Sequence, residues 1–210
     1  MSAAEANSEK PEVGRAGILS AAASLFRLHG YGGVSLRAIA AAAGIKAGSI
    51  YYHFSSKDAI VIEILDAGII AVHKEARAAV KALPAGAPPE DIFRATVRGH
   101  LRALLEHGDY TSANVRIFGQ VPAAVREANL PVRRAYEKYL DALLSDLQAA
   151  GAIRPDVKIS RLRLLLIGAM NATLEWFDPN QGSAEALADD YTNTFLNGIL
   201  DQTGENKWPT

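Results

Sequence analysis

The chain has 210 residues, of which 49% are hydrophobic, and this length and composition suffice to bury one large core or two modest ones. The absence of cysteine excludes disulfide bonds and thiol chemistry, and it fits the reducing cytoplasm, where we expect the protein to act. The net charge is −1, but residues 10–60 carry six cationic and two acidic side chains, which gives +4 there and −5 elsewhere. Such a charge asymmetry is typical of a protein that presents one of its parts to nucleic acid.

The two ends of the chain, residues 1–10 and 204–210, are expected to be disordered tails. The first ten residues contain Glu5 and Glu9 and lack the apolar stretch of a signal peptide. Apolar segments further along the chain are interrupted by charges well before the roughly 18 clean residues of a membrane-spanning helix. We therefore expect no contact with a membrane.

A first helix is predicted to end near Gly30, because Ile18, Ala22 and Phe26 recur at helical spacing and glycine is common just after a helix. The glycine cluster at 30–33 could be considered as a phosphate-binding loop. It lacks both the preceding strand and the following Lys-Ser/Thr pair of such loops, so a simple turn is favoured.

Two short helices are predicted on either side of Gly44. Ser35 can cap the first of them, and Gly44 would end it. The second follows Ile45, and residues 46–58 carry amide, hydroxyl, aromatic and cationic groups that are suited to binding phosphates. Two short helices joined by a tight glycine turn indicate a helix-turn-helix motif, whose second helix enters the major groove of DNA.

The residues of this part resemble the N-terminal half of TetR/AcrR-type transcriptional regulators. The resemblance covers roughly residues 15–65 and rests on the segments Gly30-Tyr31, Val34-Ser35-Leu36-Arg37-Ala38-Ile39-Ala40, Ala43-Gly44-Ile45, Gly48-Ser49-Ile50-Tyr51-Tyr52-His53-Phe54 and Ser56-Lys57. The length of the chain and its helical remainder fit the same family. One departure is that the family commonly has Lys or Arg directly before Gly48, whereas this chain has Ala47 there and Lys46 one position earlier.

The resemblance implies a homodimeric regulator, most often a repressor, that binds a palindromic double-stranded DNA operator and is released by a small, largely apolar effector. Residues 11–56 would form the DNA-binding domain, and residues 57–203 would form the effector-binding and dimerisation domain. Helix polarity at the amides of Gly48 and Ser49 would favour a phosphate. The residues expected to contact DNA are Ser35, Arg37, Lys46, Gly48, Ser49, Tyr51, Tyr52, His53 and Lys57.

Two neighbours of these residues, Ile50 and Phe54, are assigned to the core instead. Tyr51 could equally be packed there, because an aromatic residue at helical spacing is often buried. His53 is assigned to a phosphate contact rather than to a metal ion.

The rest of the chain is also predicted to be helical, so that the whole fold is all-α with about nine or more helices. Residues 57–83 would form one long helix that connects two parts of the molecule, and Pro131 is placed in the first turn of a later helix. The other helices are predicted at 90–107, 111–120, 131–150, 160–177 and 183–199.

The last two predicted helices could either complete the core of a monomer or form a dimer interface. The helix at 160–177 is apolar almost all round, so both of its faces must be covered. The family resemblance favours a four-helix interface between two subunits. The residues assigned to it are Leu162, Leu166, Leu187, Tyr191, Phe195 and Ile199.

The C-terminal helices should enclose a ligand chamber, as the resemblance implies and as their mixture of apolar and polar residues suggests. Each of these residues taken alone is more typical of a packed core than of a ligand contact. The expected lining is His100, Leu104, Tyr110, Asn114, Ile117, Phe118, Tyr136, Tyr139, Leu143, Met170, Asn171, Leu174 and Trp176.

The segments 153–156 and 171–179 are similar to those of regulators of fatty-acid or sterol breakdown that respond to acyl-CoA thioesters. An acyl chain would lie in the chamber, and its nucleotide phosphates would need cations, for which Arg116, Arg133, Arg161 and Arg163 are available. The alternative is that these arginines are surface charges and that the effector is a neutral aromatic or drug-like molecule of an efflux or catabolic operon.

Catalysis finds little support in the sequence, although an enzyme built on a helical bundle is a remote alternative. There is no cysteine nucleophile, no Gly-x-Ser-x-Gly elbow and no His-Glu-x-x-His pair. His100 and His107 would share a helix face about 10 Å apart, too far for one metal ion. We expect no enzymatic activity, no cofactor and no metal site.

Overall fold

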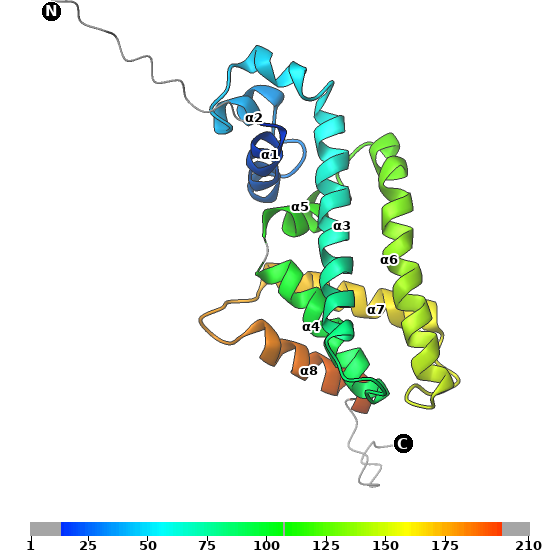
Figure 1. Ribbon diagram of the computed structural model, residues 1–210. Helices are drawn as coiled ribbons and strands as arrows, with labels where there is room; N and C mark the ends of the chain where they lie inside the picture. Colours follow the sequence, from blue (N-terminus) through cyan, green and yellow to red (C-terminus); the bar gives the residue numbers. More distant parts are fainter. Residues whose placement is uncertain (1–13, 107, 199–210) are drawn as a thin grey trace, which may run out of the picture.

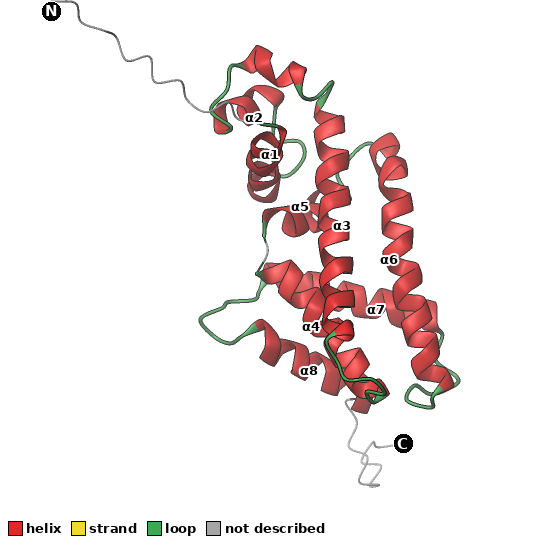
Figure 2. Ribbon diagram, viewed as in Figure 1, coloured by secondary structure: helices red, strands yellow, loops and turns green. Residues whose placement is uncertain are grey.

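The computed structural model describes residues 14–106 and 108–198, and these residues form helices and connecting turns without any strand (Figure 1, Figure 2). The predicted all-α fold is therefore confirmed for the described chain. The predicted tails, His107 and Ile199 lie outside the described residues. The elements are α1 (Arg15–His29), α2 (Leu36–Ala42), η1 (Ala47–Tyr52), α3 (Lys57–Lys81), α4 (Pro89–Leu105), α5 (Asp109–Ile117), α6 (Ala123–Ala149), α7 (Ile159–Ala172), η2 (Thr173–Glu175) and α8 (Ala184–Asn197).

The turn between α2 and η1 has the geometry that its glycine predicts. The amide of Ile45 donates to the Ala40 carbonyl at 3.0 Å, and the amide of Gly44 donates to the Ala41 carbonyl at 3.1 Å. This pair of bonds is the Schellman motif, and it requires the φ of +70° that Gly44 adopts. Ser35 caps α2 by accepting a hydrogen bond from the Ala38 amide at 3.1 Å.

The long helix α3 connects the two ends of the molecule, as the sequence predicts. It begins after the capping residue Ser56 and runs for 25 residues, about 37 Å, from the N-terminal helices to the opposite end (Figure 1). It packs against α4, α5 and α6 along its length. At its far end α3 packs against α4, and α4 packs in turn against α8 (Figure 1).

The N-terminal helices share one continuous core with the rest of the protein. Buried residues of α1, α2, η1 and the first half of α3 form a cluster that also includes Ala113 and Ile117 of α5 and Val121 and Val125 after it. The predicted domain boundary at 56/57 therefore falls inside this cluster. Because close-packed interiors transmit strain, a movement of α5 would displace the N-terminal helices that pack on it.

The predicted start of a helix at Pro131 is wrong. The helix α6 begins at Ala123, directly after Pro122, and Pro131 lies inside it. Proline lacks an amide hydrogen, so the carbonyl of Glu127 loses its helical partner. Pro131 and Glu127 are both exposed, and water can therefore solvate that carbonyl. Pro122 takes the helix-starting place that the sequence analysis gave to Pro131.

The C-terminal half contains two further clusters of buried residues. One joins α4, α6, α7 and α8 around Phe93, Leu144 and Met170, and the other joins α3, α4 and α6 around Ala76, Ala103 and Leu140. No helix in the described part of the chain is both long and apolar enough to cross a membrane.

Candidate nucleic-acid interface and effector chamber

The short helix η1 exposes its two tyrosines and buries its isoleucine. Tyr52 is 90% exposed and Tyr51 is 62% exposed, whereas Ile50 and Phe54 are buried in the N-terminal core. The assignment of Ile50 and Phe54 to the core is thereby confirmed. Two neighbouring tyrosine hydroxyls are left on the surface, and a phenol can both donate a hydrogen bond to a phosphate and place its ring against a base.

The other residues predicted to contact DNA differ in how accessible their polar groups are. Arg37, Lys46 and Gly48 are exposed, and His53 is half-buried. The Ser35 hydroxyl oxygen accepts a capping bond, which leaves its hydrogen free to donate. The Ser49 amide already donates to the Lys46 carbonyl at 2.9 Å, so a contact of Ser49 with DNA would come from its hydroxyl.

Lys57 is not the exposed cation that the sequence analysis expected. Its ammonium group donates to the Tyr31 carbonyl and lies 3.8 Å from the centre of the Tyr31 ring. Burial lowers the pKa of Lys57, and the neighbouring Asp58 opposes this effect. The Tyr31 hydroxyl in turn donates to Asp58 at 2.7 Å, and burial together with this bond raises the pKa of Tyr31 to about 12.

These residues and Gln120 form a hydrogen-bonded cluster that we call the Tyr31 clamp. The Gln120 side-chain oxygen accepts from the Tyr31 amide at 2.9 Å, and its nitrogen donates to the Arg116 carbonyl at 3.0 Å. The clamp of Tyr31, Lys57, Asp58 and Gln120 therefore ties the α1–α2 loop to α3 and to the end of α5. The sequence analysis missed it, because polar residues so distant in the chain carry no local signal of their contact.

A second link joins the DNA-binding helices to α5. The Arg27 guanidinium of α1 lies 2.7 Å from the Asp109 carboxylate at the start of α5. Both side chains are partly exposed, so the pair contributes little to overall stability. Its position matters more than its strength, because it spans the boundary between the two predicted domains.

A cavity of about 130 Å³ lies between α3, α4, α5, α6 and α7, and we call it the chamber. Five of the residues predicted to line a chamber do so: His100, Leu104, Asn114, Tyr136 and Asn171. The other lining residues are Gly68, Ile69, Val72, Thr111, Val115, Arg133, Glu137, Arg163, Leu164 and Ile167.

The remaining predicted lining residues lie elsewhere, and their assignment to the chamber wall is wrong. Most of them fill the surrounding cores, and Trp176 is 55% exposed at the surface. Helical spacing alone does not distinguish a residue that faces a neighbouring helix from one that faces a cavity. The residues concerned are Tyr110, Ile117, Phe118, Tyr139, Leu143, Met170, Leu174 and Trp176.

The imidazole of His100 lines the chamber and is only 3% exposed. Its Nδ1 lies 2.7 Å from the Tyr136 hydroxyl, and its Nε2 has no hydrogen-bond partner among the described residues. Burial lowers the pKa of His100 to about 4, and interaction with Asn171 opposes this effect only partly. The ring is therefore neutral near pH 7.

The guanidinium of Arg133 also lines the chamber, and it lies 3.7 Å from the centre of the Phe118 ring. It donates one hydrogen bond to the Asn114 side-chain oxygen at 3.3 Å, while its buried Nε has no partner within the described chain. Burial lowers the pKa of Arg133, and the charge of Glu137 opposes this effect. Arg163 differs, because it pairs with Asp141 at 2.7 Å and with Glu137 at 3.7 Å.

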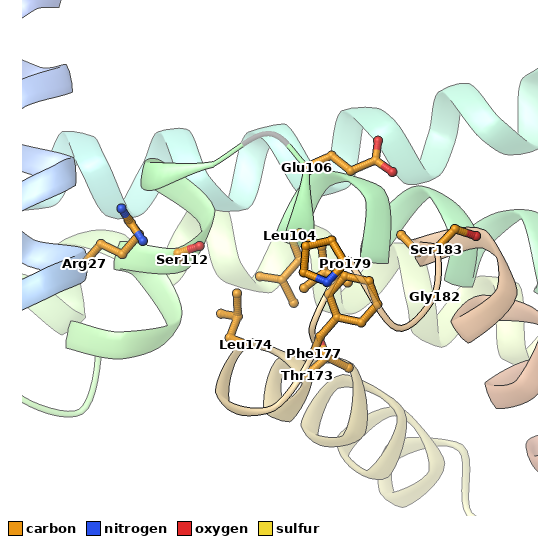
Figure 3. A pocket seen from close by; sticks show the side chains of 12 residues that line it. Arg27, Leu104, Glu106, Ser112, Thr173, Leu174, Phe177, Pro179, Gly182 and Ser183 are labelled. Atoms are coloured by element: carbon orange, nitrogen blue, oxygen red, sulfur yellow. The ribbon is translucent and has the colours of Figure 1, made fainter.

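An open groove of about 550 Å³ borders the chamber (Figure 3). Arg27 lies at one end of it and Ser183 at the other (Figure 3). A second hollow of about 260 Å³ continues the groove past Arg27 to Arg116. The full lining of the first part is Arg27, Leu104, Leu105, Glu106, Ser112, Thr173, Leu174, Phe177, Pro179, Gly182, Ser183 and Ala184.

The chamber and the groove are separated by single side chains. Leu104 lines both the chamber and the first part of the groove, and Val115 lines both the chamber and the second hollow. A molecule that displaced either side chain could extend from one space into the other. No three His, Asp or Glu side chains in the described residues are grouped as metal ligands.

The exposed apolar surface of the C-terminal half lies on α7 and η2. Leu164 and Leu165 are each 62% exposed, and Trp176 continues this surface at the end of η2. The assignment of Leu166 to a dimer interface is wrong, because this residue is 1% exposed inside the protomer's core. The other assigned residues within the described chain are half-buried against the same core: Leu162, Leu187, Tyr191 and Phe195.

Comparison with known proteins identifies the family. Residues 18–64 match the family "Bacterial regulatory proteins, tetR family", and residues 86–199 match "Tetracyclin repressor-like, C-terminal domain". The chain is 26% identical over 198 residues to the HTH-type transcriptional repressor KstR2 of Rhodococcus jostii, covering 88% of this chain and 90% of the repressor.

Two solved structures share the fold. The structure of AibR in complex with isovaleryl coenzyme A and operator DNA has a TM-score of 0.77 at 21% identity and covers 88% of this chain and 99% of AibR. The structure of FadR from Bacillus subtilis in complex with stearoyl-CoA has a TM-score of 0.74 at 20% identity and covers 89% of this chain and 100% of FadR. The family matches together span most of the chain, including both the helix-turn-helix and the chamber, and the protein therefore belongs to the TetR family of transcriptional regulators.

Proposed function

We propose that the protein is a homodimeric repressor of transcription that leaves its palindromic operator when a short-chain acyl-CoA thioester binds. The observation that carries the proposal is the small, largely apolar chamber next to a long groove with two arginines. Such a pair of spaces fits a ligand with a short apolar end and a long anionic end. The relative KstR2 is named as a repressor, which supports the direction of the response.

For operator binding, η1 enters the major groove of DNA and presents its exposed tyrosines. Tyr51, Tyr52, Arg37 and Lys46 donate to phosphates or contact base edges, and Gly48 lets the backbone approach closely. No other atom lies within 4 Å of a side chain added at Gly48, so its lack of one leaves room for DNA rather than for the protein.

For dimerisation, the exposed stripe on α7 and η2 meets the same stripe of a second copy around a two-fold axis. The stripe comprises Leu164, Leu165 and Trp176 together with the exposed small residues Gly168 and Ala172, which allow two helices to approach closely. Two recognition helices would then lie about 34 to 36 Å apart and read two half-sites of one operator.

The size of the chamber favours a short acyl group. A cavity of about 150 Å³ can hold a benzene molecule, so the 130 Å³ of the chamber suits a group of about that size or smaller. A group of this size is close to the branched part of the isovaleryl group in the ligand of AibR. It is much smaller than the stearoyl chain in the ligand of FadR. The acyl chain considered from the sequence is therefore proposed to be a short one.

The groove would hold the remainder of the thioester. From a chamber-bound acyl group the chain passes Leu104 into the groove, where Arg27 and Arg116 can receive phosphate groups. The sequence analysis named Arg116 but not Arg27. Of the other arginines that it named, Arg163 is already paired and Arg161 is exposed on α7.

Release from DNA follows from competition at Arg27. A phosphate bound to Arg27 competes with Asp109, and it loosens the link between α1 and α5. Because the ligand binds the loosened arrangement better, it shifts the population away from the spacing that fits the operator.

The proposal is tested by the release of fluorescent operator DNA, with the operator selected from a random DNA pool by the protein itself. Butanoyl-CoA and isovaleryl-CoA are expected to lower the anisotropy at micromolar concentration, whereas stearoyl-CoA and the free acids are not. Release by neutral aromatic compounds alone would contradict the thioester and support the drug-like alternative. Failure to retard any selected DNA would contradict the operator-binding role.

A further inference from the structure

Two polar atoms on the chamber wall make no hydrogen bond of ordinary geometry in the described protein, Arg133 Nε and His100 Nε2. Arg133 can only donate, and its buried Nε–H is unbonded. His100 is neutral, and only one of its two nitrogens carries a proton. Which one it is depends on the Tyr136 hydroxyl.

The buried Tyr136 hydroxyl fixes the protonation of His100. Within the described residues its hydroxyl has no acceptor other than His100 Nδ1, at 2.7 Å. Burial raises the pKa of Tyr136, so the hydroxyl keeps its proton and donates it to Nδ1. The His100 proton must then be on Nε2, which makes no hydrogen bond of ordinary geometry in the described protein and has the Asn171 side chain as its polar neighbour on the chamber wall. A buried donor without an acceptor is costly, and a ligand that supplies an acceptor removes that cost.

The charge of the chamber wall favours an anionic acceptor. Arg133 has no carboxylate within ion-pair distance in the described chain, and Glu137, which also lines the chamber and whose charge raises the pKa of Arg133, pairs instead with Arg163 at 3.7 Å. The Asn114 side chain does not compensate, since its nitrogen donates to the Leu65 carbonyl at 2.6 Å and its oxygen is neutral. A carboxylate beside Arg133 would form a charge-assisted hydrogen bond in a largely dry space.

We propose that the acyl group of the effector carries its own carboxylate, which accepts hydrogen bonds from His100 and Arg133. This inference rests on the proposed function and narrows its ligand to a CoA thioester of a short dicarboxylic acid. The malonyl group is small enough for the chamber, because its methylene and carboxylate together are smaller than the benzene molecule that a cavity of about 150 Å³ can hold. A saturated acyl group of the same size would leave both donors unbonded.

Two pairs of thioesters isolate the carboxylate, because the members of each pair have the same shape. Malonyl-CoA matches isovaleryl-CoA, and succinyl-CoA matches 4-methylpentanoyl-CoA, with a carboxylate in place of an isopropyl group. We expect the wild-type protein to be released from operator DNA at a malonyl-CoA or succinyl-CoA concentration about tenfold or more below that of its apolar partner. Direct titration calorimetry should give the same order of affinities.

Variants of Arg133 assign the effect to the chamber. Arg133→Met keeps a long side chain against Phe118. In this variant the ratio of the releasing concentrations of the apolar and the carboxylate-bearing thioester is expected to fall to about one. Arg133→Lys keeps a cation and should retain much of that ratio. Arg134→Met, on the exposed side of the same helix, is the matched control and should behave as the wild type. Equal operator affinity without effector and equal Tm establish that each variant is folded.

Several outcomes would overturn the inference. Isovaleryl-CoA acting at the same or a lower concentration than malonyl-CoA would overturn it and leave the proposed thioester response intact. An undiminished preference in Arg133→Met would also overturn it, because the carboxylate would then be bound elsewhere. Absence of release by all four thioesters would contradict the proposed function itself, and with it this inference.

Discussion

At the residue scale, two lysines near η1 have opposite roles although they look equivalent in the sequence. Lys46 is exposed in the turn before η1, whereas the ammonium group of Lys57 is held by the Tyr31 carbonyl and ring. A lysine contributes to the salt dependence of DNA binding only where it neutralises a phosphate. The two positions therefore form a matched pair for experiment.

Lys46→Ala is expected to lower the slope of log K against log salt concentration by about one unit, as the loss of one phosphate contact does. Lys57→Met should leave that slope unchanged and reduce the free energy of unfolding by about 1 to 2 kcal/mol, because the Tyr31 carbonyl loses its partner. Anisotropy titrations between 50 and about 200 mM salt and urea unfolding measure the two effects. If Lys57→Met lowers the slope of log K against log salt concentration, the ammonium group of the wild-type Lys57 must leave the Tyr31 clamp and contact a phosphate in the DNA complex.

His100 makes stability depend on pH on the acid side. Its folded-state pKa of about 4 lies below the ordinary value of 6.5, so the unfolded chain takes up a proton first as the pH falls. The contribution of the neutral His100 ring to the free energy of unfolding is therefore fully present above pH 6.5. About 3 kcal/mol of this free energy is lost as the pH falls from 6.5 to 4. His100→Gln should remove this part of the loss, measured as the wild-type minus variant difference in urea unfolding at both pH values. If the free energy of unfolding changes with pH equally in the wild type and in His100→Gln, His100 is not the source of the loss.

At the element scale, α7 has one buried face and one exposed apolar face, which the sequence could only describe as apolar all round. Leu166 and Met170 belong to the inner face and Leu165 belongs to the outer face, whereas Leu164 is exposed and also lines the chamber. Phe195 of α8, which the sequence placed at the interface, lies edge-on to Phe93 with 6.3 Å between the ring centres. A charge at Phe195 would therefore damage the protomer, and Leu165 is the better position for testing the dimer.

Leu165→Glu is expected to raise the dissociation constant of the dimer about a hundredfold or more, because an unpaired carboxylate in an apolar interface costs several kcal/mol. Operator affinity should fall with it, since each protomer then reads only one half-site. Ile70→Glu places the same charge at another exposed apolar residue, on α3, and should leave the protein dimeric. Sedimentation velocity at micromolar concentration is the measurement, and a dimeric Leu165→Glu protein would contradict the proposed interface.

The elements that the sequence predicts well are those with signals at both ends. Ser35 and Gly44 delimit α2, and Ser56 starts α3, because a capping hydroxyl and a left-handed glycine act on their own neighbours. The start of α6 is missed because Pro122 and Pro131 are both acceptable in a first turn, and only packing decides between them. The chamber is predicted in part, since a residue that lines a cavity and one that fills a core share the same helical spacing.

At the scale of the whole molecule, the DNA-binding helices are joined to the effector domain by the shared core, the Tyr31 clamp and the Arg27–Asp109 pair. The shared core fixes the position of α1 on α5. The Tyr31 clamp and the Arg27–Asp109 pair can exchange hydrogen-bond partners at a smaller cost in free energy than the core can be repacked. The pair at Arg27 is the one that also lines the groove. A ligand in the groove therefore acts on the link itself, and it needs no separate path through the protein.

Asp109→Asn should make the protein more sensitive to thioesters, because the phosphate no longer competes with a carboxylate for Arg27. We expect half-maximal release from the operator at a concentration about three to tenfold lower, with a change in the free energy of unfolding below about 1 kcal/mol. Asp156→Asn, which removes the partner of the exposed Arg154 at a distance from the groove, is the control. Unchanged or reduced sensitivity would exclude competition at Arg27.

The buried side chain of Leu104 between the chamber and the groove has a consequence for the timing of the response. Leu104 is 1% exposed, so in the proposed binding mode an acyl group can pass from the groove into the chamber only while α4 and its neighbours are briefly open. Such openings occupy a small share of the time, and both arrival and departure of the ligand are slowed by the same factor. A ligand already inside thus remains through short falls in its supply. In the proposed function, transcription would follow the average abundance of the metabolite and ignore its momentary fluctuations.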